Sequence, residues 1–142
     1  MAIDQESCLN LIDSMQERLW SDYVTHYYLT CIIGLRKFQQ KSDLVRSALS
    51  ETTPQYSKSR VAAAWACLEL GLDDQMEIIY ELANSAYWQP LRWTCQQVFA
   101  RLVEKQQLNV EGNKKIFQQF FSHKMMHRFH LGDLPYIYMY DL

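Results

Sequence analysis

Glycine and proline are scarce in this sequence, which has four glycines and three prolines among its 142 residues. All-β folds usually need these residues in frequent tight turns, so their scarcity argues against an all-β chain. Long apolar runs are also missing, and none approaches the roughly 20 residues that a membrane-spanning helix requires. The composition therefore indicates a helical protein that does not cross a membrane.

Signals for secretion and for bulk electrostatic binding are equally weak. Asp4 and Glu6 lie where a secretory signal peptide would carry positive charge. The four cysteines include no C-x-x-C pair, and Cys31, Cys67 and Cys95 fall among apolar residues of expected helices, as buried thiols do. The net charge of −2 is too small to indicate nucleic-acid or membrane binding. We expect a protein of the reducing cytoplasm that holds no cofactor.

Apolar residues are plentiful, because the sequence is 49% hydrophobic and 13% aromatic. Such a composition predicts one folded domain over residues 1–142. The apolar residues recur at helical spacing between breaks such as Pro54 and Gly71. Seven helices and no convincing strand follow from this pattern, so we predict an all-α fold. The expected helices span residues 5–19, 23–39, 42–50, 55–70, 73–83, 90–106 and 113–129.

Individual helices carry expectations about their ends and faces. Ser21 or Asp22 can cap the second helix, and Asp73 can cap the fifth. Gly71 ends the fourth helix in a left-handed conformation, and Pro90 suits the first turn of the sixth. Three helices show an apolar stripe. In the first it is formed by Cys8, Leu11, Ile12, Met15 and Leu19, in the second by Tyr28, Ile32 and Leu35, and in the fifth by Met76, Ile79, Tyr80 and Leu82, facing inward.

The most informative pattern is a repeat in which an arginine precedes small and apolar residues at helical spacing. Segment 59–71 is echoed by segment 91–102, and Arg60 and Arg92 lie 32 residues apart. A period near this length in a helical chain is typical of stacked helix pairs, that is, of an α-solenoid. An arginine in the first turn opposes the helix dipole. We therefore expect both arginines to contact a carboxylate or main-chain carbonyls of the adjacent repeat, and the alanines to allow close helix packing.

Residues 59–102 resemble HEAT-like repeats of the short type found in bilin-lyase-related proteins. The first copy has Arg60, an alanine-rich helix, the Leu70-Gly71 pair and a second helix led by Asp73. The second copy keeps its arginine but has Val103 in place of the closing glycine. The resemblance implies a small α-solenoid whose second helices line a concave binding surface. It divides the chain into an N-terminal helix at 1–20, helix pairs at 22–50, 55–84 and 88–129, and an extended tail at 131–142.

Three groups of residues are candidates for a partner-binding surface. An acidic group on an expected second helix comprises Asp73, Asp74, Glu77 and Glu81, of which Asp73, Glu77 and Glu81 form a ridge along one side. An aromatic group surrounds the turn that follows and comprises Tyr87 and Trp88, with Trp93 nearby. Three tail tyrosines alternate with apolar residues, as in an extended segment: Tyr136, Tyr138 and Tyr140. The plainer interpretations are a solvated helix face, a plug between repeats and a cap over the end of the solenoid.

Metal and nucleic-acid sites have weaker support. Three histidines share one face near the end of the last expected helix, a spacing that could hold Zn²⁺: His123, His127 and His130. No glutamate follows the first of them, so the H-E-x-x-H pattern is absent and a solvated helix face explains them better. The cations of this helix are too few for a groove that binds duplex DNA: Lys114, Lys115, Lys124 and Arg128.

These observations favour binding over catalysis, since no phosphate-binding loop or nucleophile elbow is present. We expect the chain to bind another protein that has a basic surface. It would act as an inhibitor or immunity protein that blocks a toxin or effector stoichiometrically, or alternatively as an adaptor or assembly factor. The resemblance also offers enzyme alternatives, a DNA glycosylase or a bilin-lyase relative. The sequence leaves the partner and the oligomeric state open.

Overall fold

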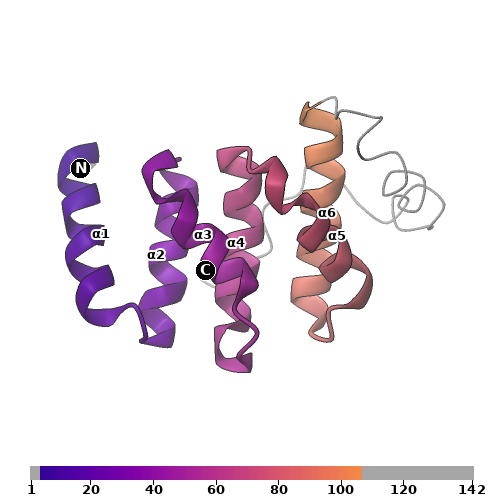
Figure 1. Ribbon diagram of the computed structural model, residues 1–142, viewed down its shortest axis with the longest axis horizontal. Helices are drawn as coiled ribbons and strands as arrows, with labels where there is room; N and C mark the ends of the chain where they lie inside the picture. The colour runs from indigo at the N-terminus through magenta and orange to yellow at the C-terminus, as the bar shows by residue number, and fades with distance from the viewer. Residues whose placement is uncertain (1–3, 107–142) are drawn as a thin grey trace. The chain divides into compact units, whose positions relative to one another are not determined.

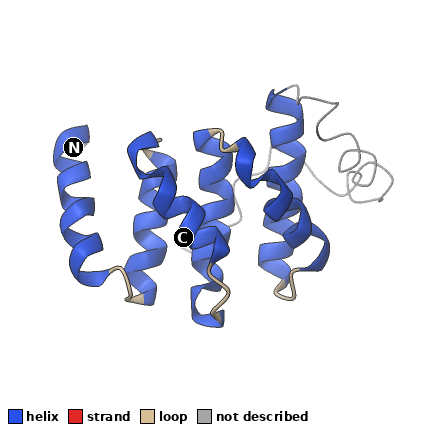
Figure 2. Ribbon diagram, in the orientation of Figure 1, coloured by secondary structure: helices blue, strands red, loops and turns tan. Residues whose placement is uncertain are grey.

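A computed structural model describes residues 4–106, and within this range the chain is all-α, as the sequence predicts (Figure 2). The chain divides into two compact units, Met1–Leu70 and Gly71–Leu142. Short 3₁₀ turns, η1 (Gln39–Lys41), η2 (Pro54–Tyr56) and η3 (Asp73–Gln75), join some of the helices. The α-helices are α1 (Gln5–Leu19), α2 (Tyr23–Leu35), α3 (Ser42–Ser50), α4 (Ser57–Leu70), α5 (Met76–Ser85) and α6 (Gln89–Gln106).

The helices expected at residues 5–19 and 42–50 are confirmed with the same bounds. None of the helices in the described part of the chain is long and apolar enough to cross a membrane. The helix expected at residues 113–129 and the tail at 131–142 lie outside the described residues.

The N-terminal unit is organised around α2, which packs against α1 on one side and α4 on the other (Figure 1). Helix α3 packs against both α2 and α4. All four helices contribute buried apolar side chains to the core of this unit, including Ile12, Leu29, Ile33, Val45, Leu49, Val61 and Trp65.

Helices α2 and α4 approach each other so closely that one of them needs a glycine. A Cβ atom added at Gly34 of α2 would lie 2.9 Å from the Cβ of Ala66 and 3.0 Å from its Cα. Ala62, Ala63 and Ala64 of α4 are buried as well. The expectation that the alanines of α4 permit close packing is confirmed, since small side chains on both sides reduce the distance between helix axes.

Helix α2 ends at Leu35, four residues earlier than the predicted end at residue 39. Lys37 takes a left-handed conformation (φ 54°), its amide donates to the carbonyl of Gly34, and the amide of Phe38 donates to Ile33. This is the double hydrogen bond of a Schellman cap, in which an apolar residue after the cap returns to the core. Phe38 is fully buried, so the burial of its ring ends the helix here.

The N-termini of α1 and α2 are capped by aspartates. The Asp4 side chain accepts a hydrogen bond from the Ser7 amide at 2.9 Å, and Asp22 accepts one from the Thr25 amide at 3.0 Å. Of the two N-cap residues expected for the second helix, Ser21 and Asp22, the structure has Asp22 as the cap. Hydrogen bonds of this kind satisfy amides that have no partner within the helix.

The apolar stripe predicted for α2 lies largely on its solvent side. Tyr28 and Leu35 are exposed and Ile32 is half-buried. Cys31 is also half-buried, whereas the other cysteines expected to be buried, Cys67 and Cys95, have no more than trace exposure. The face of α2 that packs against its neighbours is instead formed by His26, Tyr27, Leu29, Thr30, Ile33 and Gly34.

The C-terminal unit is described from Gly71 to Gln106 and consists of η3, α5 and α6, with α5 packed against α6. Gly71 has φ 67°, which confirms its predicted left-handed conformation after α4. Pro90 lies in the first turn of α6, as expected. The two helices enclose apolar side chains, among them Met76, Ile79, Ala83, Val98, Phe99 and Leu102, while Tyr80 and Leu82 are half-buried.

Candidate protein-interaction site

The acidic residues of the C-terminal unit lie on two elements. Asp73 and Asp74 belong to η3, whereas Glu77 and Glu81 belong to α5, and all four are exposed. The prediction that Asp73 caps the helix is wrong, because the 3₁₀ turn delays the start of α5 to Met76 and the cap position makes no side-chain hydrogen bond. The sequence predicted one continuous acidic ridge along a helix. In the structure only Glu77 and Glu81 lie on the helix, one helical turn apart, and Asp73 and Asp74 lie in the 3₁₀ turn before it.

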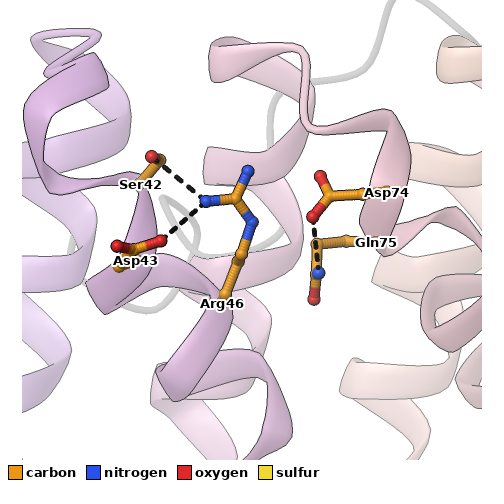
Figure 3. Close-up of polar contacts among 5 residues, drawn as sticks. All are labelled: Ser42, Asp43, Arg46, Asp74 and Gln75. Carbon is orange, nitrogen blue, oxygen red and sulfur yellow. Dashed lines mark hydrogen bonds and ion pairs between the residues drawn. The ribbon is translucent and has the colours of Figure 1, made fainter.

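The four acids differ in the contacts that they make. Asp74 accepts a hydrogen bond from the Gln75 side chain at 3.2 Å (Figure 3). Among the described residues, Asp73, Glu77 and Glu81 have no ion pair. Elsewhere, in the N-terminal unit, Asp43 of α3 accepts a hydrogen bond from Arg46 at 2.9 Å, the kind of neutralising contact that these three acids lack (Figure 3).

Helix stability alone does not account for Glu81. An acid in the first turn, such as Glu77, interacts favourably with the helix dipole, but this effect fades beyond that turn. Glu77 and Glu81 are four residues apart, where like charges repel by a few tenths of a kcal/mol. The last turn of α5 has no basic residue that would offset this repulsion. The acidic pair therefore gives the surface of this unit a negative potential at a small cost to the helix.

Aromatic side chains lie in the turn between α5 and α6, which holds Tyr87 and Trp88, and at the start of α6, which holds Trp93. Tyr87 is 100% exposed, Trp93 is 38% exposed and Trp88 is half-buried. A fully exposed tyrosine contributes nothing to the core of its own unit. Aromatic side chains that project from a rigid surface are common among residues that dominate binding energy.

Two side chains of α6 hold this turn against the end of α5. Arg92 donates from Nη1 to the carbonyl oxygen of Ala86 at 3.0 Å, and Gln96 donates from Nε2 to that of Ala83 at 2.8 Å. Gln96 is buried, so its hydrogen bond is shielded from competing water. Because the acceptors lie just before Tyr87, the main chain that carries this tyrosine is fixed from two points.

Arg60 makes the corresponding contact in the N-terminal unit. Its Nε donates to the carbonyl oxygen of Leu49, in the last turn of α3, at 2.8 Å. Both arginines of the sequence repeat therefore bind main-chain carbonyls at the end of the preceding helix. Of the two contacts predicted for them, a carboxylate or main-chain carbonyls, the structure has the second. A positive charge is favourable there, since the end of a helix carries unpaired carbonyls and a partial negative charge.

An aromatic cluster around His26 did not emerge from the sequence patterns. The His26 side chain of α2 lies 4.0 Å from the Trp20 ring and 4.6 Å from the Tyr56 ring, measured between centroids. Tyr56 also packs edge-to-face on Tyr23 and donates from its hydroxyl to the carbonyl of Ser21 at 2.9 Å. The spacing of Trp20, Tyr23 and His26 by three residues is the signal that could have indicated this cluster.

The environment of His26 favours its neutral form. The residue is 3% exposed, and its Nδ1 atom has no hydrogen-bond partner within the described part of the chain. Burial lowers the pKa of His26, and the negative charge of Glu51 opposes this shift only in part. The pKa of Glu51 is itself lowered, chiefly because the Thr53 side chain and amide donate hydrogen bonds to it. The cluster has the chemistry of a packed core and carries no charge at neutral pH.

The remaining candidate residues fall outside the described range, namely Tyr136, Tyr138 and Tyr140 of the tail and His123, His127 and His130. Over residues 4–106, no group of three His, Cys, Asp or Glu side chains is placed to hold a metal ion. The predicted site residues that the structure does bring into one unit are the four acids and the aromatic residues of the α5–α6 turn.

Comparison with known proteins finds no family model that matches this chain and no curated protein that matches it.

Proposed function

We propose that this chain is a HEAT-like helical-repeat protein that binds a basic surface of another protein and has no catalytic role. The observation that supports this most directly is Tyr87, fully exposed on a turn that Arg92 and Gln96 hold in place. The acids of η3 and α5 belong to the same unit and supply the negative charge. Together these residues form the proposed partner-binding surface: Asp73, Asp74, Glu77, Glu81, Tyr87 and Trp88.

The two kinds of residue would contribute differently to binding. Exposed carboxylates attract a basic partner over several ångströms, which mainly raises the association rate. Tyr87 would be buried in a pocket of the partner and would mainly slow dissociation. Because the main chain beside it is already held, little main-chain conformational entropy is lost when the tyrosine binds, and the remaining cost is that of its side-chain rotamers.

The specific role that we propose is stoichiometric inhibition, as by an immunity protein that blocks a basic toxin or effector. An adaptor or assembly factor would use the same surface, so the surface by itself supports both roles. The distinction lies in the activity of the captured partner. An inhibitor abolishes that activity when one equivalent of the chain has been added, whereas an adaptor leaves it intact.

Affinity capture from cells with charge-reversal variants tests the proposed surface. Glu77→Lys with Glu81→Lys should abolish capture of the specific partner, and Tyr87→Ala should weaken binding by about 30-fold or more, as for other hot-spot residues. The matched control is Glu6→Lys with Glu17→Lys, since both glutamates are exposed on α1 and the change in net charge is identical. Partners retained by the wild type and the control but lost by the test variants are identified by mass spectrometry.

Equal capture by the wild type, the control and the two test variants would contradict the proposed surface. Circular dichroism of each variant should match the wild type, because every substituted side chain is exposed. Once a partner is purified, its association rate should fall steeply as salt rises, and the slope should be smaller for Glu77→Gln with Glu81→Gln, which removes the two charges without reversing them.

A further inference from the structure

The helix that precedes α2 lacks the anchor that the repeat provides elsewhere. Arg60 and Arg92 lie 32 residues apart, and each holds the end of the helix before its own. Tyr28 of α2 lies 32 residues before Arg60 and so occupies the corresponding position. Gly34 and Ala66 have the same spacing and approach each other closely, which supports this register between α2 and α4. The repeat position in α2 therefore offers no cation to the end of α1.

An aromatic cluster binds the end of α1 instead. Trp20 follows the last residue of α1, and its ring lies 4.0 Å from that of His26. The Tyr56 hydroxyl donates to the carbonyl oxygen of the next residue, Ser21, at 2.9 Å. His26 joins the two contacts, since its ring is also 4.6 Å from that of Tyr56. The carbonyl thus accepts from a phenol where the repeat elsewhere supplies a guanidinium, and the phenol packs on a histidine.

Few other contacts hold α1 in the N-terminal unit. The helix packs mainly on α2. Among its residues whose burial is described, Cys8 and Ile12 are the buried ones of the predicted apolar stripe, whereas Leu11 is half exposed. Its ion pair, between Asp13 and Lys41 of η1, is open to solvent on the aspartate side, and such pairs contribute little to stability. Separation of α1 should therefore cost less than disruption of the contacts among α2, α3 and α4.

The groups around His26 do not favour a charge on its ring. Titratable side chains that face the ring or its neighbours come from α2, the segment before η2, η2 itself and α4: Asp22, Tyr23, Glu51, Tyr56 and Arg60. Asp22 already accepts two hydrogen bonds in the first turn of α2, and Glu51 accepts two from the segment that follows it. Glu51 also faces the positive charge of Arg60, and the α1 side of the cluster is the uncharged Trp20 ring. Burial therefore prevails over the attraction of Glu51 and lowers the pKa of His26.

We propose that this cluster is a pH-sensitive latch, in which protonation of His26 at mildly acidic pH releases α1 while α2, α3 and α4 stay packed. An imidazolium requires acceptors for both of its N–H groups, and Nδ1 of His26 has none within the described part of the chain. Trp20 is half-buried, so its movement away from His26 gives the ring access to water. Arg60 and Arg92 keep their charge over this pH range, so the ends of α3 and α5 stay held.

Cysteine alkylation measures the release, because α1 carries Cys8, 6% exposed, and α4 carries Cys67, which is fully buried. The purified full chain is treated with N-ethylmaleimide between pH 7.5 and pH 5, and each site is quantified by mass spectrometry. Each rate is divided by that of the same site in the urea-unfolded chain at the same pH, which removes the pH dependence of the thiolate. The normalised rate of Cys8 should rise by roughly 3- to 30-fold, the upper limit for one group with an ordinary pKa of 6.5, and that of Cys67 should not change.

Substitution of single histidines tests which group is responsible. His26→Gln should remove the rise at Cys8, and the matched control His127→Gln, which deletes an imidazole elsewhere in the sequence, should retain it. A rise that persists in His26→Gln overturns the proposal.

The wild type alone also decides the proposal, whatever the stability of the variants. A normalised Cys8 rate that does not change with pH overturns it. So does a rate that falls as the pH decreases, because the imidazolium would then be held between the aromatic rings by cation–π attraction. Equal rises at Cys8 and Cys67 would show that the whole unit unfolds and would overturn the local release of α1.

Discussion

At the scale of single residues, Arg60 and Arg92 show why a charge that is unfavourable in its own helix can be favourable in the fold. Each guanidinium leaves the positive end of its own helix and reaches the negative end of the preceding one. The two contacts use different nitrogens, Nε in Arg60 and Nη1 in Arg92, and acceptors at different distances along the chain. What the two arginines have in common is therefore the site that they bind, the C-terminal end of the preceding helix.

Removal of the Arg60 side chain should destabilise the N-terminal unit. Arg60→Ala leaves the Leu49 carbonyl without this donor, and hydrogen bonds that involve a charged group contribute about 1.5–3 kcal/mol. Because the contact is only partly buried, we expect the free energy of unfolding to decrease by about 1–2 kcal/mol, toward the lower end of this range. Urea denaturation provides the measurement. Arg18→Ala at the exposed end of α1 serves as the control and should change stability by less than about 0.5 kcal/mol. Equal effects of the two substitutions would refute the proposed role of Arg60.

At the scale of secondary-structure elements, the contact between α2 and α4 determines how the N-terminal unit packs. Its closeness depends on Gly34 and Ala66, which leave no room for a further methyl group. Glycine in a helix interior usually costs about 0.5–1 kcal/mol relative to alanine. Here that cost is offset by the packing of the alanine-rich α4 against α2.

Gly34→Ala should therefore destabilise the protein, although the same change in an open helix stabilises it. Overpacking of this kind costs about 1–3 kcal/mol. The measurement is a double-mutant cycle with Ala66→Gly, which removes the methyl group at 2.9 Å but leaves the Cα at 3.0 Å. We expect the double variant to recover part of the loss caused by Gly34→Ala. A neutral or stabilising effect of Gly34→Ala alone would show that the helices separate without cost.

Much of the secondary structure could be predicted from the sequence. The helix bounds follow from caps and apolar periodicity, which are local properties, and those of α1 and α3 agree with the expectation. The early end of α2 could not be predicted in the same way, because it depends on Phe38 reaching a core that other segments build. Likewise, the stripe of α2 was visible in the sequence, but which side of the helix its neighbours would cover depends on tertiary packing.

The candidate site was predictable in part for a similar reason. The acids and Tyr87 could be identified because surface helices and turns show their polar or aromatic character directly in the sequence. Of the two contacts that hold the turn, that of Arg92 with a main-chain carbonyl was among those expected from the repeat, whereas that of Gln96 with the carbonyl of Ala83 left no pattern of side chains to read. In the cluster around His26, Tyr56 lies 30 or more positions along the chain from both Trp20 and His26, so it could not be found from helical spacing.

At the scale of the whole molecule, the buried His26 makes stability depend on pH. The folded protein lowers the pKa of this imidazole from its ordinary value of 6.5, so the unfolded chain takes up its proton first as the pH falls. The contribution to stability is complete above the unfolded-state pKa. It is lost progressively as the pH falls below that value and through the lower pKa of the folded state.

We therefore expect the unfolding temperature to decrease between pH 7.5 and pH 5, and His26→Gln to reduce this dependence. The three histidines at residues 123, 127 and 130 are present in both proteins, so their contribution cancels in the comparison. Differential scanning fluorimetry over this range provides the measurement. An identical pH profile for the two proteins would show that His26 titrates in the folded state as it does in the unfolded chain.

The carbonyl contacts of the two arginines also have a consequence for how such a sequence can change through evolution. Every residue supplies a main-chain oxygen, so these contacts impose no side-chain requirement at Leu49 or Ala86. For this contact, the side-chain requirement falls on the arginine alone. The remaining positions of the repeat are free to drift within the limits of packing, and the arginines would then persist as its most durable trace in the sequence.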